Sequence, residues 1–180
     1  MDIFKIIDKY YQNNEKAKQV LLIHSRLVAE KALKIASNLS EKTDKDLLFE
    51  GSMLHDIGMI YTHAPDIGCN GNHPYICHGI LGKKMLEEEG LPKHALICER
   101  HTGTGITREE IIEKKLPLPL KDMIPVTLEE QIICYADKFF SKNPNNLEKE
   151  KTPEKVEKML AGYGGNHLDI FRQWHLRFNV

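Results

Sequence analysis

The sequence has few cysteines, no long apolar run and almost no net charge. Its four cysteines stand singly, with no C-x-x-C pair. This spacing argues against a zinc knuckle or a disulfide framework, and it predicts free, buried thiols. Lys, Glu or Asp interrupts every apolar run, so none approaches the roughly eighteen apolar residues that a membrane-spanning helix needs. A formal net charge of −1 predicts no strong attraction to nucleic acid or to an anionic membrane.

The first residues also lack the cationic segment, apolar run and cleavage site of a secretory signal. We therefore expect a cytoplasmic protein without a membrane partner. Charged residues make up 28% and apolar residues 41% of the chain, a balance that excludes disorder on composition alone. A length of 180 residues fits one well-buried domain.

Apolar residues recur at helical spacing along most of the chain, and no strand-type alternation persists. The pattern predicts helices over residues 3–11, 15–39, 44–55, 75–89, 92–101 and 127–140, with further helices after residues 107, 152 and 165. Thr107 and Thr127, each followed by Glu three residues later, predict capping boxes. Residues 59–73 and 116–126 are expected to be irregular, and residues 141–152 have the composition of a linker. We predict an all-α, single-domain array of about eight or nine helices over 1–180. Its core covers about 20–140, and a helical extension covers 152–178.

The aromatic residues Phe171, Trp174 and Phe178 recur along one side of the last expected helix. Such a stripe either packs on the core or forms a dimer interface. Core packing is the expectation, and a homodimer stays an alternative.

The dipeptide His55-Asp56 closes a predicted helix, just before Gly58. Adjacent residues on a helix point about 100° apart, so the two side chains can reach different positions around an ion. His24 lies on the inward stripe between Val20 and Leu27, where a hydrogen-bonded core histidine is the alternative. Asp137 also lies on an inward stripe, and an unpaired carboxylate there requires a cation or a hydrogen-bond partner nearby.

Two further histidines, His78 and His101, fall near helix ends between His55-Asp56 and Asp137. In order, His24, His55-Asp56, His78, His101 and Asp137 resemble the H…HD…H…H…D pattern of the HD-domain superfamily. The resemblance implies that His24, His55, Asp56 and Asp137 hold one metal ion. Asp56 would bridge to a second ion, which His78 and His101 would complete. Imidazole and carboxylate ligands without thiolate suit iron, manganese, cobalt or zinc. The resemblance favours iron or manganese, with cobalt, nickel or zinc as alternatives, and it favours two ions over a single ion.

Three blocks, His55–Gly58, Glu99–Thr107 and Pro125–Ile132, look like a small prokaryotic family of HDIG-type proteins that is named phosphohydrolase by analogy. Met59 stands where cyclic-dinucleotide phosphodiesterases of the superfamily have the lysine of HDxxK. Gly105-Ile106-Thr107 replaces their GYP signature. These two departures argue against hydrolysis of cyclic di-GMP.

The resemblance implies metal-dependent hydrolysis of a phosphomonoester or phosphoanhydride, with a metal-bridging hydroxide as nucleophile. The expected substrate is a nucleotide or a similar small phosphorylated molecule. Asp56 is expected to be catalytic through the metals, and the loop histidines His63 and His73 are candidate proton donors. The candidates for phosphate binding are Arg26, Lys83, Lys84, Arg100 and the amides of Gly103 and Gly105, with Arg100 also a candidate catalytic residue.

Two other functions share the same ligands. Superfamily members with six ligands and two irons also include oxygenases that cleave C–H or C–P bonds. A non-catalytic module that binds a nucleotide or metal is the third possibility, although every expected ligand position is filled.

Overall fold

Polar side chains at the start of the longer helices explain where those helices begin. Asp2, Asn14 and Asp44 each accept a hydrogen bond from the backbone N–H three residues later, and Thr107 and Thr127 do the same. The capping boxes are only half formed, however. Neither glutamate accepts from the N–H of its capping threonine. Glu110 contacts Lys114 and His167, and Glu130 accepts from Arg100 and from the N–H of Val126.

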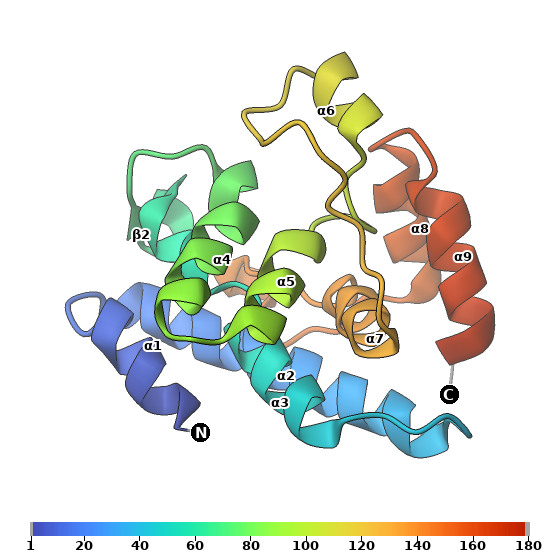
Figure 1. Ribbon diagram of the computed structural model, residues 1–180, viewed down its shortest axis with the longest axis horizontal. Coiled ribbons are helices and arrows are strands. Elements are labelled where there is room, and N and C mark those ends of the chain that lie inside the picture. Colours follow the sequence, from blue (N-terminus) through green and yellow to red (C-terminus); the bar gives the residue numbers. More distant parts are fainter. Residues whose placement is uncertain (1, 179–180) are drawn as a thin grey trace.

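The structure is a computed structural model that describes residues 2–178, and over this range the fold is all-α except for one very small sheet (Figure 1). Nine α-helices, four 3₁₀ helices (η) and two strands follow one another as α1 (Ile3–Tyr11), α2 (Glu15–Asn38), α3 (Lys45–Leu54), η1 (Ile57–Tyr61), β1 (His63–Ala64), η2 (Pro65–Ile67), β2 (Cys69–Asn70), η3 (Tyr75–Cys77), α4 (His78–Glu88), α5 (Pro92–Arg100), α6 (Arg108–Glu113), α7 (Leu128–Asp137), η4 (Pro144–Asn146), α8 (Pro153–Ala161) and α9 (His167–Phe178). The predicted all-α class is confirmed. None of these helices combines the length and the apolar character that crossing a bilayer requires.

The segment 59–73, expected to be an irregular loop, is more ordered than its sequence suggests. It forms η1 and an antiparallel pair in which His63 lies opposite Asn70 and Ala64 opposite Cys69. Strands of two residues are too short to show alternation, which explains why the sequence pattern missed them. Gly68 joins the strands with φ +85°, a backbone conformation that favours glycine.

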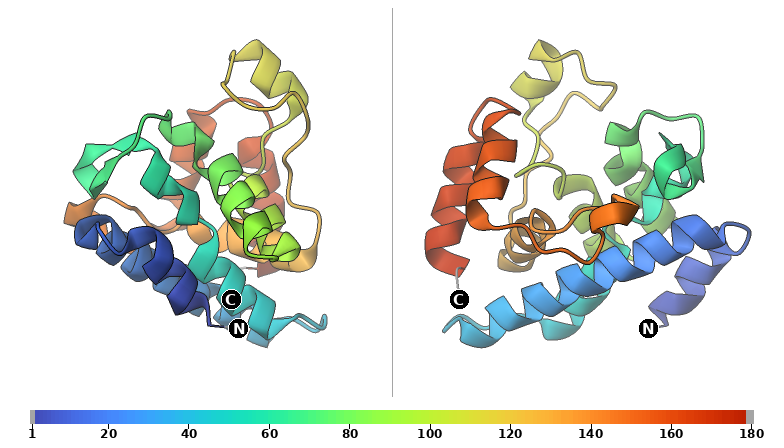
Figure 2. Two further views of the ribbon diagram at one scale, coloured as in Figure 1. Left: turned by 60° about the vertical axis from the view of Figure 1, so that its left-hand side comes forward. Right: turned by 180° about the vertical axis from the view of Figure 1, so that it is seen from behind.

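Figure 2 shows the long helix α2 running beneath the other helices. Two main apolar clusters lie along it, one at each half. One gathers residues of α1, α3, α4 and α5 around the first half of α2, including Ile7, Leu21 and Leu86. The other gathers residues of α7, α8 and α9 around its second half, including Val28 and Ile133. Because α2 belongs to both clusters, residues near its middle lie where the two halves of the molecule meet.

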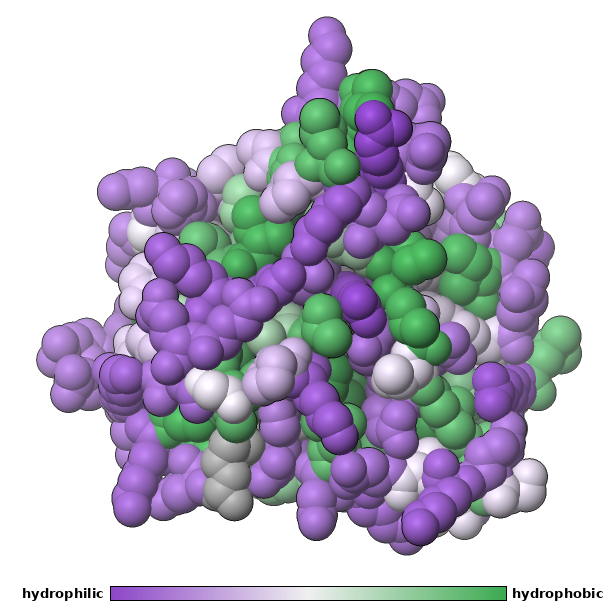
Figure 3. Space-filling view, viewed as in Figure 1, coloured by the Kyte–Doolittle hydropathy of each residue, from purple (hydrophilic) through white to green (hydrophobic). Residues whose placement is uncertain are grey.

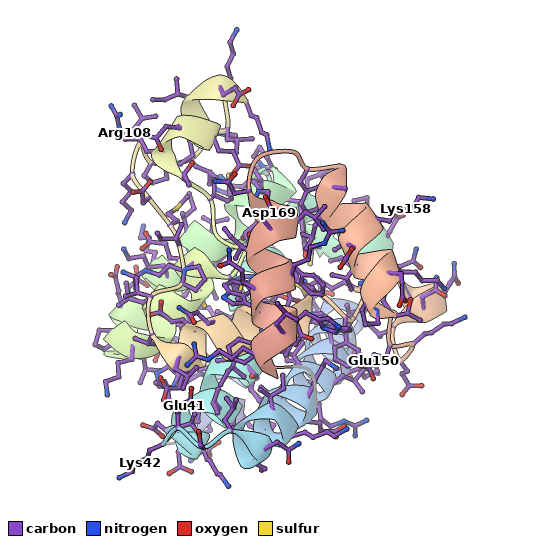
Figure 4. All side chains as sticks on the ribbon, turned by 90° about the vertical axis from the view of Figure 1, so that its right-hand side faces the viewer. Glu41, Lys42, Arg108, Glu150, Lys158 and Asp169 are labelled. Carbon is purple, nitrogen blue, oxygen red and sulfur yellow. The ribbon has the colours of Figure 1, made fainter. Side chains whose placement is uncertain are left out.

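The aromatic stripe of α9 packs on the core, as expected. Phe171, Trp174 and Phe178 are buried against α7, and Figure 4 shows α8 and α9 side by side, marked by Lys158 and Asp169. The four cysteines are free and buried, which confirms the prediction from their spacing. A third, smaller cluster under α6 holds Ile106 and Ile111 in the part of the molecule that projects at the top of Figure 1. In Figure 3, apolar side chains gather on its surface among hydrophilic ones.

Candidate metal centre

The six predicted ligands come together because their helices end, or cross, at one place. His24 lies in the middle of α2, and Asp137 is the last residue of α7. His55 caps the end of α3, Asp56 precedes η1, His78 begins α4, and His101 caps the end of α5. All six are buried. Helix ends carry unpaired backbone groups, so these positions also supply acceptors that orient the side chains.

The six residues form two groups that share one carboxylate. One ligand atom from each of His24, His55, Asp56 and Asp137 lies within 4.8 Å of the others. The same limit joins Asp56, His78 and His101 in the second group. We call these the four-ligand group and the three-ligand group.

The two oxygens of Asp56 are divided between the groups. Oδ2 lies 3.0 Å from His55 Nε2 and 3.3 Å from His24 Nε2. Oδ1 lies 3.4 Å from His78 Nε2 and 3.3 Å from His101 Nε2. Each oxygen of Asp56 therefore faces a different pair of histidines.

Backbone carbonyls fix the orientation of three of the histidine rings. His55, His78 and His101 each donate from Nδ1 to the carbonyl oxygen three residues earlier, at 2.6, 2.7 and 2.8 Å. A carbonyl oxygen can only accept, so Nδ1 carries a proton in each ring and Nε2 faces the centre. Metal-ligating histidines are oriented in this way in other metalloproteins. Burial lowers the pKa of His55, but the carboxylates of Asp56 and Asp137 raise it to about 9, so a metal ion at His55 Nε2 would replace a proton there.

The residues fit a bound cation. The Nε2 atoms of His78 and His101 lie 3.0 Å apart, and two lone pairs at that distance repel unless a proton or a metal ion lies between them. His55 Nε2 and Asp56 Oδ1 are buried and have no hydrogen-bond partner among the described residues. Buried polar atoms of this kind require a partner, and a transition-metal ion satisfies both imidazole and carboxylate.

Charges around the centre keep its carboxylates ionised. Burial alone raises a carboxyl pKa, but His55 and Lys142 hold the pKa of Asp56 well below its usual range. Lys138 and Lys142 do the same for the pKa of Asp137. Burial lowers the pKa of His78 to about 3, so this ring is neutral at ordinary pH. Ionised carboxylates and a neutral imidazole are the states that bind metal.

Four cations predicted to bind phosphate do not reach the centre. Arg26 is exposed and pairs with Glu30, because a step of two residues along α2 turns it about 200° away from His24. Arg100 donates to both oxygens of Glu130, and Lys83 pairs with Glu99. The fourth cation, Lys84, is exposed to solvent.

The loop histidines lie outside the centre as well. The side chains of His63 and His73 are exposed, and their backbones pair with each other through a bond from His63 N–H to His73 O at 2.8 Å. Neither residue lines the two cavities described below. This bond holds the two backbones together while both side chains face solvent, so neither ring reaches the centre in this structure.

The Gly103–Gly105 turn is near the centre, but two of its three backbone N–H groups already donate hydrogen bonds within the protein. Gly103 lines the smaller cavity, and both glycines have positive φ. Gly105 N–H donates to Thr102 O, and Thr104 N–H donates to the His167 ring. The turn therefore closes helix α5 and offers few free donors to a phosphate.

Two lysines that the sequence pattern missed contact the centre instead. Lys142 Nζ lies 2.7 Å from Asp56 Oδ2 and 3.8 Å from Asp137 Oδ1, and Lys138 Nζ lies 2.7 Å from Asp137 Oδ2. Lys138 follows a predicted ligand directly, so its position was a usable signal. Lys142 stands in the segment that its composition assigned to a linker, and no sequence signal distinguished it.

Two cavities open beside the centre. A cavity of about 170 Å³ is lined by His78, His101, Asp137 and the glycine turn. A cavity of about 810 Å³ is lined by segments 64–67 and 140–145. Both share the lining residues Tyr75, Phe140, Lys142, Lys151 and Met159. The smaller cavity, next to the ligands, therefore shares lining residues with the larger one, which has room for a small organic molecule.

Comparison with known proteins agrees with this geometry. The family model of the HD domain matches residues 21–141. An uncharacterized protein of Methanocaldococcus jannaschii is 40% identical over 153 residues, covering 83% of this chain and 80% of that protein. A crystal structure of the HD domain of L. monocytogenes phosphodiesterase PgpH has a TM-score of 0.55 at 18% identity and covers 93% of each chain, a likeness of fold.

Two relatives are larger proteins. The tRNA (cytidine(56)-2'-O)-methyltransferases of Picrophilus torridus and Thermoplasma volcanium are 35% and 33% identical over 129 and 126 residues. These matches cover 71% and 69% of this chain, which spans only 33% of the length of either enzyme.

Proposed function

The chain belongs to the HD-domain family, and we propose that it is a metal-dependent phosphohydrolase that uses two metal ions to hydrolyse a phosphomonoester or phosphoanhydride of a small molecule. The division of the two Asp56 oxygens between the ligand groups carries this proposal, because it gives one carboxylate a place in both halves of a binuclear site. The proposed metal ligands are His24, His55, Asp56, His78, His101 and Asp137. Iron or manganese suits their nitrogen and oxygen atoms.

Two ions so held would lower the pKa of a shared water and neutralise the charge of the phosphoryl oxygens. The protein supplies the orientation. Carbonyl groups at the helix ends hold the rings of His55, His78 and His101, and Tyr75 stacks on His78 with ring centroids 4.7 Å apart. Lys138 contacts Asp137 Oδ2 and helps to keep this carboxylate ionised, while Oδ1 faces His24 and stays available as a ligand atom. No nucleophilic Ser or Cys is required.

A nucleotide or similar molecule is the substrate class that we propose. The larger cavity combines the aromatic rings of Tyr75 and Phe140 with the polar side chains of Asn143 and Asn145, a lining suited to a base and its hydrogen-bonding groups. The similarity to two enzymes named for modifying a cytidine of tRNA is consistent with nucleotide chemistry near this domain.

A phosphatase panel with metal analysis tests the proposal. Protein purified without chelator is analysed for metals and then assayed for phosphate release from nucleotides and generic phosphoesters with iron, manganese or cobalt. We expect two ions per chain and turnover that Asp56→Ala abolishes. One ion per fully loaded chain would contradict the binuclear site, and absence of turnover with every metal would contradict the hydrolase. Oxygen uptake by the iron form would favour an oxygenase instead.

A further inference from the structure

Three lysines line the cavities beside the metal centre: Lys138, Lys142 and Lys151. Two of them donate to backbone carbonyl groups, and Lys142 differs from both. Lys138 Nζ donates to His101 O, in addition to its pairing with Asp137. Lys151 Nζ donates to Lys138 O and to Phe140 O, carbonyl groups that follow the end of α7. Among the described residues, Lys142 forms ion pairs with Asp56 and Asp137, and it also interacts with the hydroxyl of Tyr75. Its ammonium is therefore held mainly by carboxylates that a metal ion would also bind.

The oxygens that Lys142 contacts belong to the four-ligand group. Asp56 Oδ2 and Asp137 Oδ1 are the same atoms that lie 3.3 and 3.0 Å from His24 Nε2. Lys142 also lines both cavities, whereas His24 and His55 line neither. The ammonium thus stands between the four-ligand group and the space that a substrate would occupy.

The segment around Lys142 holds it in place. Phe139 and Phe140 are buried, and Lys151 N–H donates to Phe139 O at 2.8 Å, which closes the loop that begins at residue 140. Asn143 then caps η4 by accepting from Asn145 N–H. The Lys142 side chain is only 18% exposed, so the charge is partly removed from water and its interactions are strengthened.

A second cation next to Asp56 in the sequence is not available. The lysine position of HDxxK is Met59 here, and Met59 is fully buried in the apolar cluster around the first half of α2. Lys142 comes from a distant segment, one residue beyond the stretch that matches the family model, and reaches the Asp of the same motif.

We infer that Lys142 is the phosphoryl-binding cation of this site, a role that rests on the proposed function. Without metal or substrate, Asp56 and Asp137 hold its ammonium at the mouth of the four-ligand group. A metal ion held by these carboxylates would displace the ammonium, which would then be free to pair with a phosphoryl oxygen in the adjoining cavity. Lys142 therefore has opposite effects on two ligands: it competes with the metal and attracts the phosphate.

Binding of inorganic phosphate tests this role without any turnover. Phosphate is titrated calorimetrically into manganese(II)-loaded wild-type protein, Lys142→Met and Lys142→Arg, with metal content measured on the same samples. Lys149→Met is the matched control, because Lys149 is an exposed lysine of the same loop. The affinity for manganese(II) is measured separately, without phosphate, by competition with a chromophoric chelator.

We expect Lys142→Met to weaken phosphate binding at least about tenfold, the usual loss for a hydrogen bond to a charged group, and to tighten manganese binding. Lys142→Arg should bind phosphate within about threefold of the wild type because it keeps the charge. Lys149→Met should match the wild type in both measurements.

Three results would overturn the inference: no phosphate binding by the loaded wild type, equal phosphate affinity in wild type and Lys142→Met, or loss of manganese from Lys142→Met. The hydrolase proposal is decided separately by turnover. If the enzyme is active but Lys142→Met binds phosphate as tightly as the wild type, only the inference is refuted. An inactive protein whose phosphate affinity depends on Lys142 refutes only the hydrolase.

Discussion

The histidines of the metal centre and His167 are all buried, yet they use their ring nitrogens differently. His167 Nδ1 accepts from Thr104 N–H at 3.2 Å, so its other nitrogen carries the proton and donates to Glu110 Oε1 at 3.0 Å. Both nitrogens thus have protein partners, and the ring ties α9 to α6 and to the turn after α5. In the centre, by contrast, the histidines His55, His78 and His101 each donate from Nδ1 to a backbone carbonyl oxygen. Their Nε2 atoms face one another and Asp56.

The difference separates a histidine that stabilises the fold from one that binds metal. Burial does not distinguish them, since His167 is as inaccessible as His78. The partner of the second nitrogen does. A neutral ring whose Nδ1–H is already bonded needs a donor or a metal ion at Nε2, and the ion pairs of both lysines at the centre are with carboxylates.

Asp56→Ala should have the largest effect on the centre, because it removes a ligand from both groups. We expect loss of both ions and a fall in turnover of more than about a hundredfold, equivalent to several kcal/mol of transition-state stabilisation. Elemental analysis and the phosphatase assay measure the two effects. Asp169→Ala, at an exposed position of α9, is the control and should keep both ions. Retention of both ions in Asp56→Ala would defeat the bridging assignment.

His101→Ala and Asp137→Asn should each remove one ion and leave the other. His101 belongs only to the three-ligand group and Asp137 only to the four-ligand group. Metal analysis should give about one ion per chain for either variant, with activity greatly reduced. Equal loss of both ions in His101→Ala would mean that the two groups do not bind independently.

His167→Ala should cost stability without costing metal. The substitution leaves the buried Thr104 without the ring that its N–H and hydroxyl contact, and it removes one of two donors to Glu110, which keeps Lys114. Loss of a buried hydrogen-bond partner destabilises by about 1–3 kcal/mol. Chemical denaturation of the metal-free protein measures this loss, and elemental analysis of the loaded protein should still find the full number of ions. If the folded His167→Ala protein bound fewer ions than the wild type, His167 would contribute to metal binding and not only to stability.

His94 should give the smallest effect, and one that depends on pH. Burial lowers the pKa of His94 below its ordinary 6.5, although its hydrogen bond to Glu50 works in the other direction. The unfolded chain therefore binds a proton more readily, so the contribution of His94 to stability is present above pH 6.5 and is lost as the pH falls below it. Denaturation of metal-free protein at pH 7.5 and at pH 5.5 should show a smaller acid loss in His94→Gln than in the wild type. Equal losses would show that His94 does not titrate in this way.

Helical periodicity was enough to predict most of the fold. The expected helices at residues 3–11, 92–101 and 127–140 agree with α1, α5 and α7 within a few residues. The inward placement of His24 and Asp137 followed from the same periodicity and holds in the structure. The hairpin and the 3₁₀ helices between residues 57 and 77 were not predictable, because segments of two to five residues leave no periodic pattern.

Four of the cations predicted to bind phosphate lie away from the ligands. Arg26, Lys83, Lys84 and Arg100 were chosen because they lie near ligands in the sequence, but neighbours on a helix point in different directions. Three of them pair with glutamates, and Lys84 faces solvent. Lys142 was missed because its segment is polar and rich in asparagine, which describes a linker as well as it describes an ordered loop.

The sequence by itself determined the helices, the buried thiols and the order of six potential ligands, because these depend on local periodicity and on residue chemistry. Only the tertiary structure decided which atoms of those residues meet: the two oxygens of Asp56 facing different histidines, and the Lys142 ammonium beside them. Such contacts join segments up to about a hundred residues apart, and their geometry depends on how α2, α4, α5 and α7 pack, which no local pattern encodes.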